Sequence, residues 1–359
     1  MTMELPFELT RPYGLDRRAK SAILLEALSS LTDWHRDRCA PYANILERQY
    51  PGRVAASRED VPFLPVRLFK SLELRSVPQD EVIRTLTSSG TSGQAVSRIA
   101  LDRETALRQT RVLAAIVTEF LGPKRRPMIV IDSRDTVTDR AQFSARAAAV
   151  LGFSNFGRDH FYCLDGTLKP DFEGLSAFLR EHARNPVFAF GFTFVVWQGL
   201  YQAAKDSGVH LDFGPGSVLL HGGGWKRLAD RQVDNEQFKS SLRERLGFEK
   251  IFNYYGMVEQ VGSIFMECGE GHLHCPVVAD VVIRDLVNYS PLPVGREGLI
   301  QVLSALPLSY PGHSLLTEDL GTLLGEDDCA CGRLGRYFCV SGRLPQAELR
   351  GCSDTRVLP

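Results

Sequence analysis

The sequence has 359 residues, 44% of them hydrophobic, and a formal net charge of −1 at pH 7. That length predicts two domains, or one large domain with subdomains. A charge near zero gives no reason to expect nucleic acid or a membrane surface as a partner. No apolar stretch approaches the roughly 20 residues of a membrane helix, and the first residues lack the apolar core of a secretory signal. We therefore expect a cytoplasmic protein.

The spacing of apolar residues predicts helices and short strands in alternation. Residues 16–46 are amphipathic and predict a helix, with Pro41 beginning a second one. Residues 128–132 predict a buried strand, and residues 140–153 predict a helix that ends near Gly152. Three later segments begin with an apolar strand and a fourth enters a strand through a turn: 186–204, 217–228, 251–268 and 295–306. This alternation is typical of an α/β fold with ligand-binding loops at strand ends.

The eight cysteines gather toward the C-terminal end of the chain. In a long chain without a secretory signal this favours metal binding or thiol chemistry over a disulfide framework. One histidine and three cysteines lie in two short clusters and predict a closed, structural Zn²⁺ site: Cys268, His274, Cys329 and Cys331. His272 or Cys275 could replace His274 in this set. The alternative is a group of buried, reduced cysteines near a turn.

A run of seven residues, Thr87–Gly93, contains only threonine, serine and glycine. Small residues of this kind let backbone N–H and side-chain O–H groups surround phosphate oxygens. The run lacks the Gly-Lys-Ser/Thr ending of a P-loop, so that motif is excluded. By composition alone, a solvated flexible loop is the alternative.

Five segments in order resemble the motifs of the adenylate-forming enzymes. They are the run at 88–93, "HGGGW" at 221–225, "YYGMVE" at 254–259, "TEDLG" at 317–321 and "SGR" at 341–343. The sequence departs from the family pattern in three places. The lysine that usually follows the phosphate loop is missing, Val258 replaces a threonine, and Glu318 replaces a glycine.

One branch of these enzymes fits the departures. "SRIALD", "YPGHSLLTEDLG", "CACGRLG", "AELRGCSD" and "LFK" at 68–70 are similar to the LuxE-type acyl-protein synthetases over nearly the whole chain. The resemblance implies an α/β adenylation domain over 1–340, with mixed and parallel sheets, flanking helices and a helical segment at about 1–80. It implies a hinge and tail at 341–359, in place of the usual C-terminal domain.

The resemblance also implies which residues bind the nucleotide. The phosphates of ATP would lie against the run, adenine beside the glycine loop and Tyr255, and the ribose near Asp319 and Arg343. Glu259 would bind Mg²⁺ and act in catalysis, since hard cations prefer oxygen ligands. The implied ATP-binding set is Ser88, Ser89, Gly90, Thr91, Ser92, Gly93, Gly222, Gly223, Gly224, Tyr255, Gly256, Asp319 and Arg343.

The resemblance further implies a role for Cys352, which follows Arg350 and Gly351 in the sequence. A thiolate is a strong nucleophile, and a nearby cation lowers its pKa. The resemblance implies that Cys352 takes the acyl group of a carboxylic acid and passes it to a LuxC-like acyl reductase. In this family the acid is a fatty acid. The alternatives are an acid–CoA ligase of the phenylacetate type, and an inactive zinc-bearing scaffold subunit.

The acid-binding region is the least defined by sequence. Residues 188–198, "FAFGFTFVVWQ", are aromatic and apolar and predict either an acyl channel or a core strand. His221 precedes the glycine loop and either contacts the substrate carboxylate or caps a strand.

Overall fold

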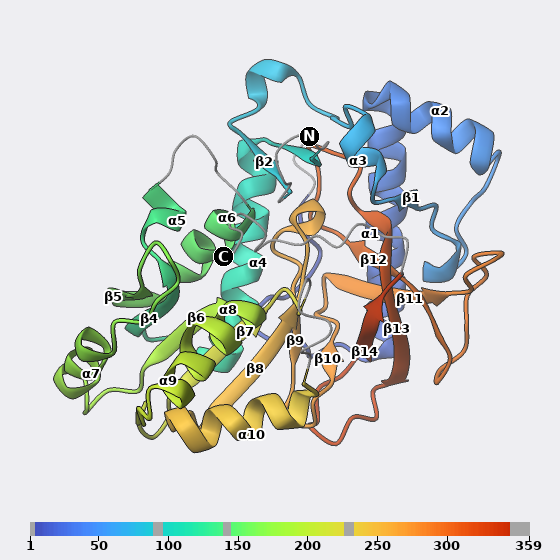
Figure 1. Cartoon of the computed structure of the whole chain (residues 1–359). Helices are drawn as coiled ribbons and strands as arrows, with labels where there is room; N and C mark the ends of the chain where they lie inside the picture. Colours follow the sequence, from blue (N-terminus) through green and yellow to red (C-terminus); the bar gives the residue numbers. More distant parts are fainter. Residues whose placement is uncertain (1–3, 89–95, 139–144, 226–232, 345–359) are drawn as a thin grey trace. The chain divides into compact units, whose positions relative to one another are not determined.

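The computed structural model describes residues 4–88, 96–138, 145–225 and 233–344 (Figure 1). These residues form two compact units. The first contains residues 4–87, 96–116 and 256–344, and the second contains residues 88, 117–138, 145–225 and 233–255. In these described parts of the chain, no helix is long and apolar enough to cross a membrane.

The second unit is built on five parallel strands in the order β5-β4-β6-β7-β8. Their bounds are β4 (Arg126–Ser133), β5 (Gly157–Leu164), β6 (Phe188–Phe192), β7 (Val218–Gly222) and β8 (Lys250–Tyr255). Every residue of β6 and β7 is buried, because helices cover both faces of a parallel sheet. The strands predicted at 128–132 and within 186–204 and 217–228 are confirmed.

Helical segments connect these strands. They are α5 (Asp135–Thr138), α6 (Ala145–Ser154), α7 (Phe172–Glu181), α8 (Thr193–Val195), the π-helical turn η3 (Val196–Gln202), α9 (Ala203–Asp206) and α10 (Asn235–Leu246). The helix predicted at 140–153 corresponds to α6, and the first residues of that prediction lie outside the described part of the chain. α10 ends as glycine chemistry predicts, with Gly247 in the left-handed conformation at φ 69°.

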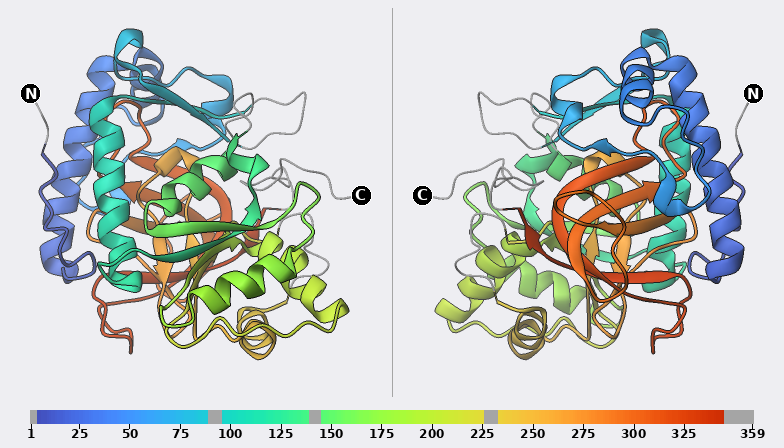
Figure 2. Two further views of the ribbon diagram at one scale, coloured as in Figure 1. Left: turned by 90° about the vertical axis from the view of Figure 1, so that its left-hand side faces the viewer. Right: turned by 90° about the vertical axis from the view of Figure 1, so that its right-hand side faces the viewer.

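The first unit contains an antiparallel sheet in the order β11-β12-β13-β14-β10-β9, and its long strands curve strongly (Figure 2). The strands are β9 (Phe265–Glu267), β10 (Leu273–His274), β11 (Ala279–Arg284), β12 (Glu297–Ser304), β13 (Ser314–Glu326) and β14 (Arg336–Arg343). β1 (Leu64–Pro65) pairs in parallel with β13, and β2 (Arg84–Thr87) pairs with β3 (Arg98–Leu101) in a separate small sheet.

The two N-terminal helices were predicted at the right places. α1 (Arg17–Arg38) begins at Asp16, whose side chain accepts a hydrogen bond of 2.9 Å from the amide of Ala19. α2 (Ala40–Gln49) carries Pro41 in its first turn, where the missing amide hydrogen costs nothing. The other helical segments of this unit are α3 (Leu68–Ser71), most of α4 (Arg103–Leu121) and the 3-10 turns η1 (Arg58–Asp60), η2 (Gln79–Glu81) and η5 (Val258–Gln260).

A buried ion cluster joins α1 to the antiparallel sheet. The ammonium group of Lys20 lies 3.7 Å from the carboxylate of Asp280 on β11, and it donates to the carbonyl of Cys275 at 3.2 Å. Arg58 also binds Asp280. Burial alone would raise the pKa of Asp280, but Lys20, Arg58 and Arg336 together lower it to about 2. These paired charges hold α1 against β11 and against Cys275, the residue that follows β10.

Candidate active and metal sites

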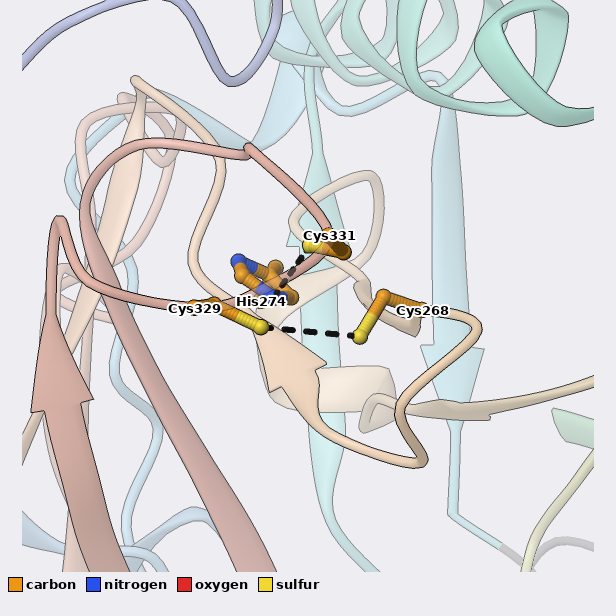
Figure 3. A group of neighbouring side chains, drawn as sticks. All are labelled: Cys268, His274, Cys329 and Cys331. Carbon is orange, nitrogen blue, oxygen red and sulfur yellow. Dashed lines mark hydrogen bonds between the residues drawn. The ribbon is translucent and has the colours of Figure 1, made fainter.

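The four side chains predicted to bind zinc come together in the first unit (Figure 3). Cys268 and His274 lie on either side of the turn between β9 and β10, and Cys329 and Cys331 lie in the turn between β13 and β14. One ligand atom from each residue lies within 4.8 Å of all the others. The Cys268 and Cys329 sulfurs are 4.0 Å apart, and Cys331 Sγ is 3.3 Å from His274 Nε2.

These distances fit a tetrahedral ion. A Zn²⁺ ion with Zn–S bonds of about 2.3 Å and Zn–N bonds of about 2.0 Å separates its ligand atoms by about 3.5–3.8 Å. Burial raises the pKa of the Cys268 thiol and lowers the pKa of His274 to about 4. The imidazole is therefore neutral at neutral pH and has a lone pair to offer, whereas the thiols would release their protons to solvent on binding the metal.

His272 and Cys275, the alternatives to His274, occupy different positions. His272 Nδ1 lies 3.5 Å from Cys329 Sγ, at the edge of the cluster, and its ring stacks on Tyr337 with centroids 5.0 Å apart. The Cys275 thiol is buried and is not among the clustered ligand atoms. His274, and not Cys275, therefore belongs to the clustered ligand set.

Glu259, the predicted Mg²⁺ ligand, lies in the 3-10 turn η5 and is only 7% exposed. Burial raises the pKa of its carboxyl group, whereas a hydrogen bond with Ser97 and the charges of Lys70 and Arg343 lower it. Ser97 lies four residues beyond the end of the Thr87–Gly93 run. A buried carboxylate of this kind gains from a bound divalent cation, which offsets its desolvation.

Asp319 and Arg343, the predicted ribose-binding pair, lie directly opposite each other on β13 and β14. Arg343 Nε is 3.8 Å from Asp319 Oδ1, and Arg343 Nη2 donates to Glu318 at 2.9 Å. Arg67 also donates to Glu318, at 2.8 Å. Glu318, which replaces the family glycine, therefore binds both Arg67 and Arg343, next to Asp319 in the chain.

The glycines at 222–224 have different neighbours in the second unit. A Cβ added at Gly222 would lie 2.6 Å from the Tyr254 ring, and one at Gly223 would lie 2.6 Å from Phe192. An added Cβ at Gly224 would meet nothing within 4 Å in the described part of the chain. Gly222 and Gly223 are thus required by aromatic packing, whereas no described atom crowds the Cβ position of Gly224. Tyr255 is half-buried at the end of β8.

The aromatic segment at 188–198 is core over most of its length. Phe188 and Phe190 have no exposed surface, and the Phe190 ring stacks on Phe153 with centroids 4.3 Å apart. His221 is 2% exposed, and its Nδ1 lies 2.9 Å from the Thr193 hydroxyl. Burial and the charge of Lys239 lower the pKa of His221 to about 3. The structure shows this ring packed on Phe238 of α10, with centroids 4.5 Å apart.

Several predicted site residues lie outside the described part of the chain. They are Ser89, Gly90, Thr91, Ser92, Gly93 and Cys352. Ser88 is described and directly follows β2. No sequence motif predicted a role for Ser97, and Lys70 was part of a family segment without a role of its own. No local pattern links either residue to Glu259, since Ser97 and Glu259 are 162 positions apart in the chain.

Comparison with solved structures defines the class of fold. Over 96% of this chain and 80% of the other, the chain is similar to an open conformation of 2-hydroxyisobutyryl-CoA ligase in complex with 2-HIB-AMP and CoA, with a TM-score of 0.72 and 16% identity. It is also similar to ATP-bound MatB from Rhodopseudomonas palustris, with a TM-score of 0.50 and 13% identity over 75% and 49% of the two chains. The fold is that of the adenylate-forming enzymes, so the predicted fold class is confirmed.

Comparison with protein families gives a narrower assignment than the fold does. The chain belongs to the acyl-protein synthetase family LuxE, whose model matches residues 10–357. It is 26% identical to the long-chain-fatty-acid–luciferin-component ligase of Vibrio harveyi, over 89% of this chain and 83% of that protein. It is 24% identical to the protein of the same name in Aliivibrio fischeri, over 87% and 82%. The resemblance found in the sequence motifs is thereby confirmed.

Proposed function

We propose that the protein activates a carboxylic acid, in this family a fatty acid, as an acyl-adenylate and then transfers the acyl group to its own Cys352. The observation that carries this proposal is the family match over residues 10–357, which includes both the Glu259 segment and Cys352. The adenylate-forming fold supports the first step. The family name, acyl-protein synthetase, supports the second.

In the first step a carboxylate oxygen of the acid attacks the α-phosphorus of ATP. A new P–O bond forms, the bond to the β-phosphate breaks, and pyrophosphate leaves with its electron pair. The protein has little covalent chemistry to do and acts by positioning anions and offsetting developing charge. Glu259 would hold Mg²⁺, Asp319 would accept hydrogen bonds from the ribose with Arg343 beside it, and Gly224 would leave room next to adenine.

In the second step the Cys352 thiolate attacks the acyl carbon. The bond between that carbon and the adenylate oxygen breaks, AMP leaves, and a thioester remains on the protein. Arg350, two residues earlier, would favour the thiolate form by its charge. An acyl reductase partner would then accept the group. The proposal also includes an acyl reductase as the partner protein and the cytoplasm as the location.

The cluster of Cys268, His274, Cys329 and Cys331 would hold a structural Zn²⁺ ion. Four protein ligands leave the ion no open position, so it would support the fold and take no part in the reaction. The cluster ties together two turns of the first unit and lies beside the N-terminal segment, since the Tyr13 ring meets His274 edge-on at 6.2 Å.

Intact-protein mass spectrometry after incubation with ATP, Mg²⁺ and a panel of acids tests the proposal. The wild-type protein should gain the mass of an acyl group that hydroxylamine removes. Cys352→Ser should still release AMP slowly but gain no mass. Cys339→Ser, which changes a half-buried cysteine of β14, is the matched control and should behave as wild type.

Two other outcomes would favour different functions. AMP release that depends on added coenzyme A, with Cys352 dispensable, would identify an acid–CoA ligase. Absence of AMP release and of pyrophosphate exchange with every acid tested would favour the inactive scaffold subunit.

A further inference from the structure

The turn that carries Glu259 has little regular structure of its own to hold it in place. It is the 3-10 turn η5 (Val258–Gln260), and a turn this short has poor internal hydrogen-bond geometry. The amide of Gln260 donates to the carbonyl of Met257 at 3.1 Å, and the amide of Ser263 donates to the carbonyl of Gln260 at 3.3 Å. The position of a metal-binding carboxylate on this turn therefore depends on the contacts that η5 makes with neighbouring segments.

The side chain of Gln260, the residue after Glu259, makes such contacts. It is only 2% exposed. Its Nε2 group donates to the carbonyl of Gly312 at 2.7 Å and to the carbonyl of Val302 on β12 at 3.2 Å. Because both neighbours are carbonyl oxygens, which can only accept hydrogen bonds, the amide group has one possible orientation. A single side chain thus joins η5 to β12 and to the segment before β13.

Glycines let the backbone on either side of Gln260 pack closely against the same unit. A Cβ added at Gly312 would lie 2.9 Å from the carbonyl oxygen of Glu259. A Cβ added at Gly262, which has φ 88°, would lie 2.7 Å from the Cα atom of Gln109 on α4. All of these residues belong to the first unit. The backbone of η5 is therefore packed against β13's preceding segment and α4, and the amide of Gln260 fixes it between them.

We propose that Gln260 is a positioning residue for adenylation, because its hydrogen bonds to Gly312 and Val302 hold Glu259 where that residue would bind Mg²⁺. This inference rests on the proposed function, since it assigns a residue to the same site. Mg²⁺ demands near-octahedral geometry with oxygen ligands at about 2.0–2.1 Å, so a carboxylate that binds it must be held in place. A displacement of about 1 Å in a supporting element can slow a reaction about 100-fold.

Gln301 on β12 provides a matched control in the same sheet. It is fully buried, its Oε1 accepts from Arg284 Nε at 2.5 Å, and its Nε2 donates to the Ser314 hydroxyl at 2.8 Å. These partners lie outside η5. Gln260→Met and Gln301→Met each remove a buried amide and leave its partners unpaired, so both variants should unfold at lower denaturant concentration than wild type.

Binding of Mn²⁺ with ATP, followed by electron paramagnetic resonance in the absence of acid, tests the inference beside acid-dependent pyrophosphate exchange. Mn²⁺ replaces Mg²⁺ as the probe because it takes the same oxygen ligands. Gln260→Met should weaken Mn²⁺ binding and slow exchange about 10- to 100-fold, as loss of a group that orients a metal ligand does. Gln301→Met should keep both within about twofold of wild type, since its partners are remote from η5.

A purely structural role for Gln260 predicts another result. Equal loss of Mn²⁺ binding in Gln260→Met and Gln301→Met, or no loss in Gln260→Met, would overturn the inference, as would a wild-type protein that binds no Mn²⁺ with ATP. If a methionine variant does not fold, Gln260→Asn and Gln301→Asn shorten each side chain by one methylene and allow the same comparison. Absence of acid-dependent pyrophosphate exchange in the wild type would instead refute the proposed function, and the Mn²⁺ comparison would still be readable.

Discussion

Cys268 Sγ and Cys329 Sγ lie 4.0 Å apart, although 61 positions separate the two residues in the chain. The pair joins the turn after β9 to the turn after β13, and His274 and Cys331 complete the set at 3.3 Å from each other. A metal ion here would close a long loop of the chain, which removes conformational freedom from the unfolded state.

Protein purified without chelator should carry about one zinc ion per chain by elemental analysis. Cys329→Ser should lose the metal, because three ligands bind zinc much more weakly than four. Closure of a loop of this length is worth roughly 4 kcal/mol by the chain-entropy estimate. The variant should therefore unfold at lower denaturant concentration than wild type.

Cys339→Ser is the control for this prediction, since Cys339 lies on β14 outside the ligand set. It should retain the zinc and nearly all of the stability. Full stability in Cys329→Ser, or no metal in the wild-type protein, would show that the cluster is a group of reduced cysteines.

The sequence predicted elements and motifs well where the information is local. Asp16 and Pro41 mark the starts of α1 and α2 as predicted, and the cysteine spacing identified side chains that do come together. Contacts such as Ser97 with Glu259, or His35 with His313, depend on the whole fold and leave no local pattern. The segment at 188–198 could not be assigned from sequence, because the same aromatic residues can line an acyl channel or fill a core. Only the packing of these side chains in the folded protein distinguishes the two.

Glu259→Gln should abolish most acid-dependent pyrophosphate exchange and leave the protein at least as stable. The amide cannot bind Mg²⁺ as a carboxylate does, and losing one charge-stabilising group typically costs about 100-fold in rate. Stability should hold because the substitution removes a charge that is buried in η5. Denaturant unfolding and exchange assays on the same preparation would check both parts.

The pH profile offers a second measurement on the same residue. Burial raises the pKa of Glu259, and the carboxyl group must lose its proton to bind the cation. Exchange activity should therefore fall as pH decreases through a value above the ordinary range of glutamate, and more Mg²⁺ should move that fall to lower pH. A profile that does not respond to Mg²⁺ would assign the fall to another group.

Gly222→Ala and Gly224→Ala should differ in their effects. The new Cβ of Gly222→Ala would meet the Tyr254 ring at 2.6 Å and the Tyr254 carbonyl oxygen at 2.7 Å, so overpacking should cost about 1–3 kcal/mol. Gly224 has φ 66° and open space, so alanine there should cost about 1 kcal/mol from backbone strain alone. Gly224→Ala should instead weaken nucleotide binding. Equal ATP affinity in Gly224→Ala and wild type would remove Gly224 from the predicted adenine contact.

A pair of buried histidines should make the protein sensitive to acid. The rings of His35 on α1 and His313 before β13 stack with centroids 5.1 Å apart and an interplanar angle of 21°. His35 Nδ1 lies 2.8 Å from the Ser76 hydroxyl, and His313 Nε2 lies 3.0 Å from the Thr32 hydroxyl. Burial lowers the pKa of both, to about 3 for His313.

The sign of the effect follows from proton binding. Below pH 6.5 the unfolded chain binds protons at these histidines and the folded protein does not, so stability is complete above about pH 6.5 and falls as pH decreases toward the folded pKa. His313, with a pKa of about 3 in the folded protein, should contribute a loss of about 2 kcal/mol between pH 7 and pH 5, and His35 should contribute a loss in the same direction. His35→Gln keeps a polar side chain near Ser76 and removes one titrating group. The gap in unfolding free energy between wild type and His35→Gln should therefore narrow as the pH falls from 7 to 5. A gap that stays constant would mean that His35 takes up its proton in the folded protein as readily as in the unfolded chain.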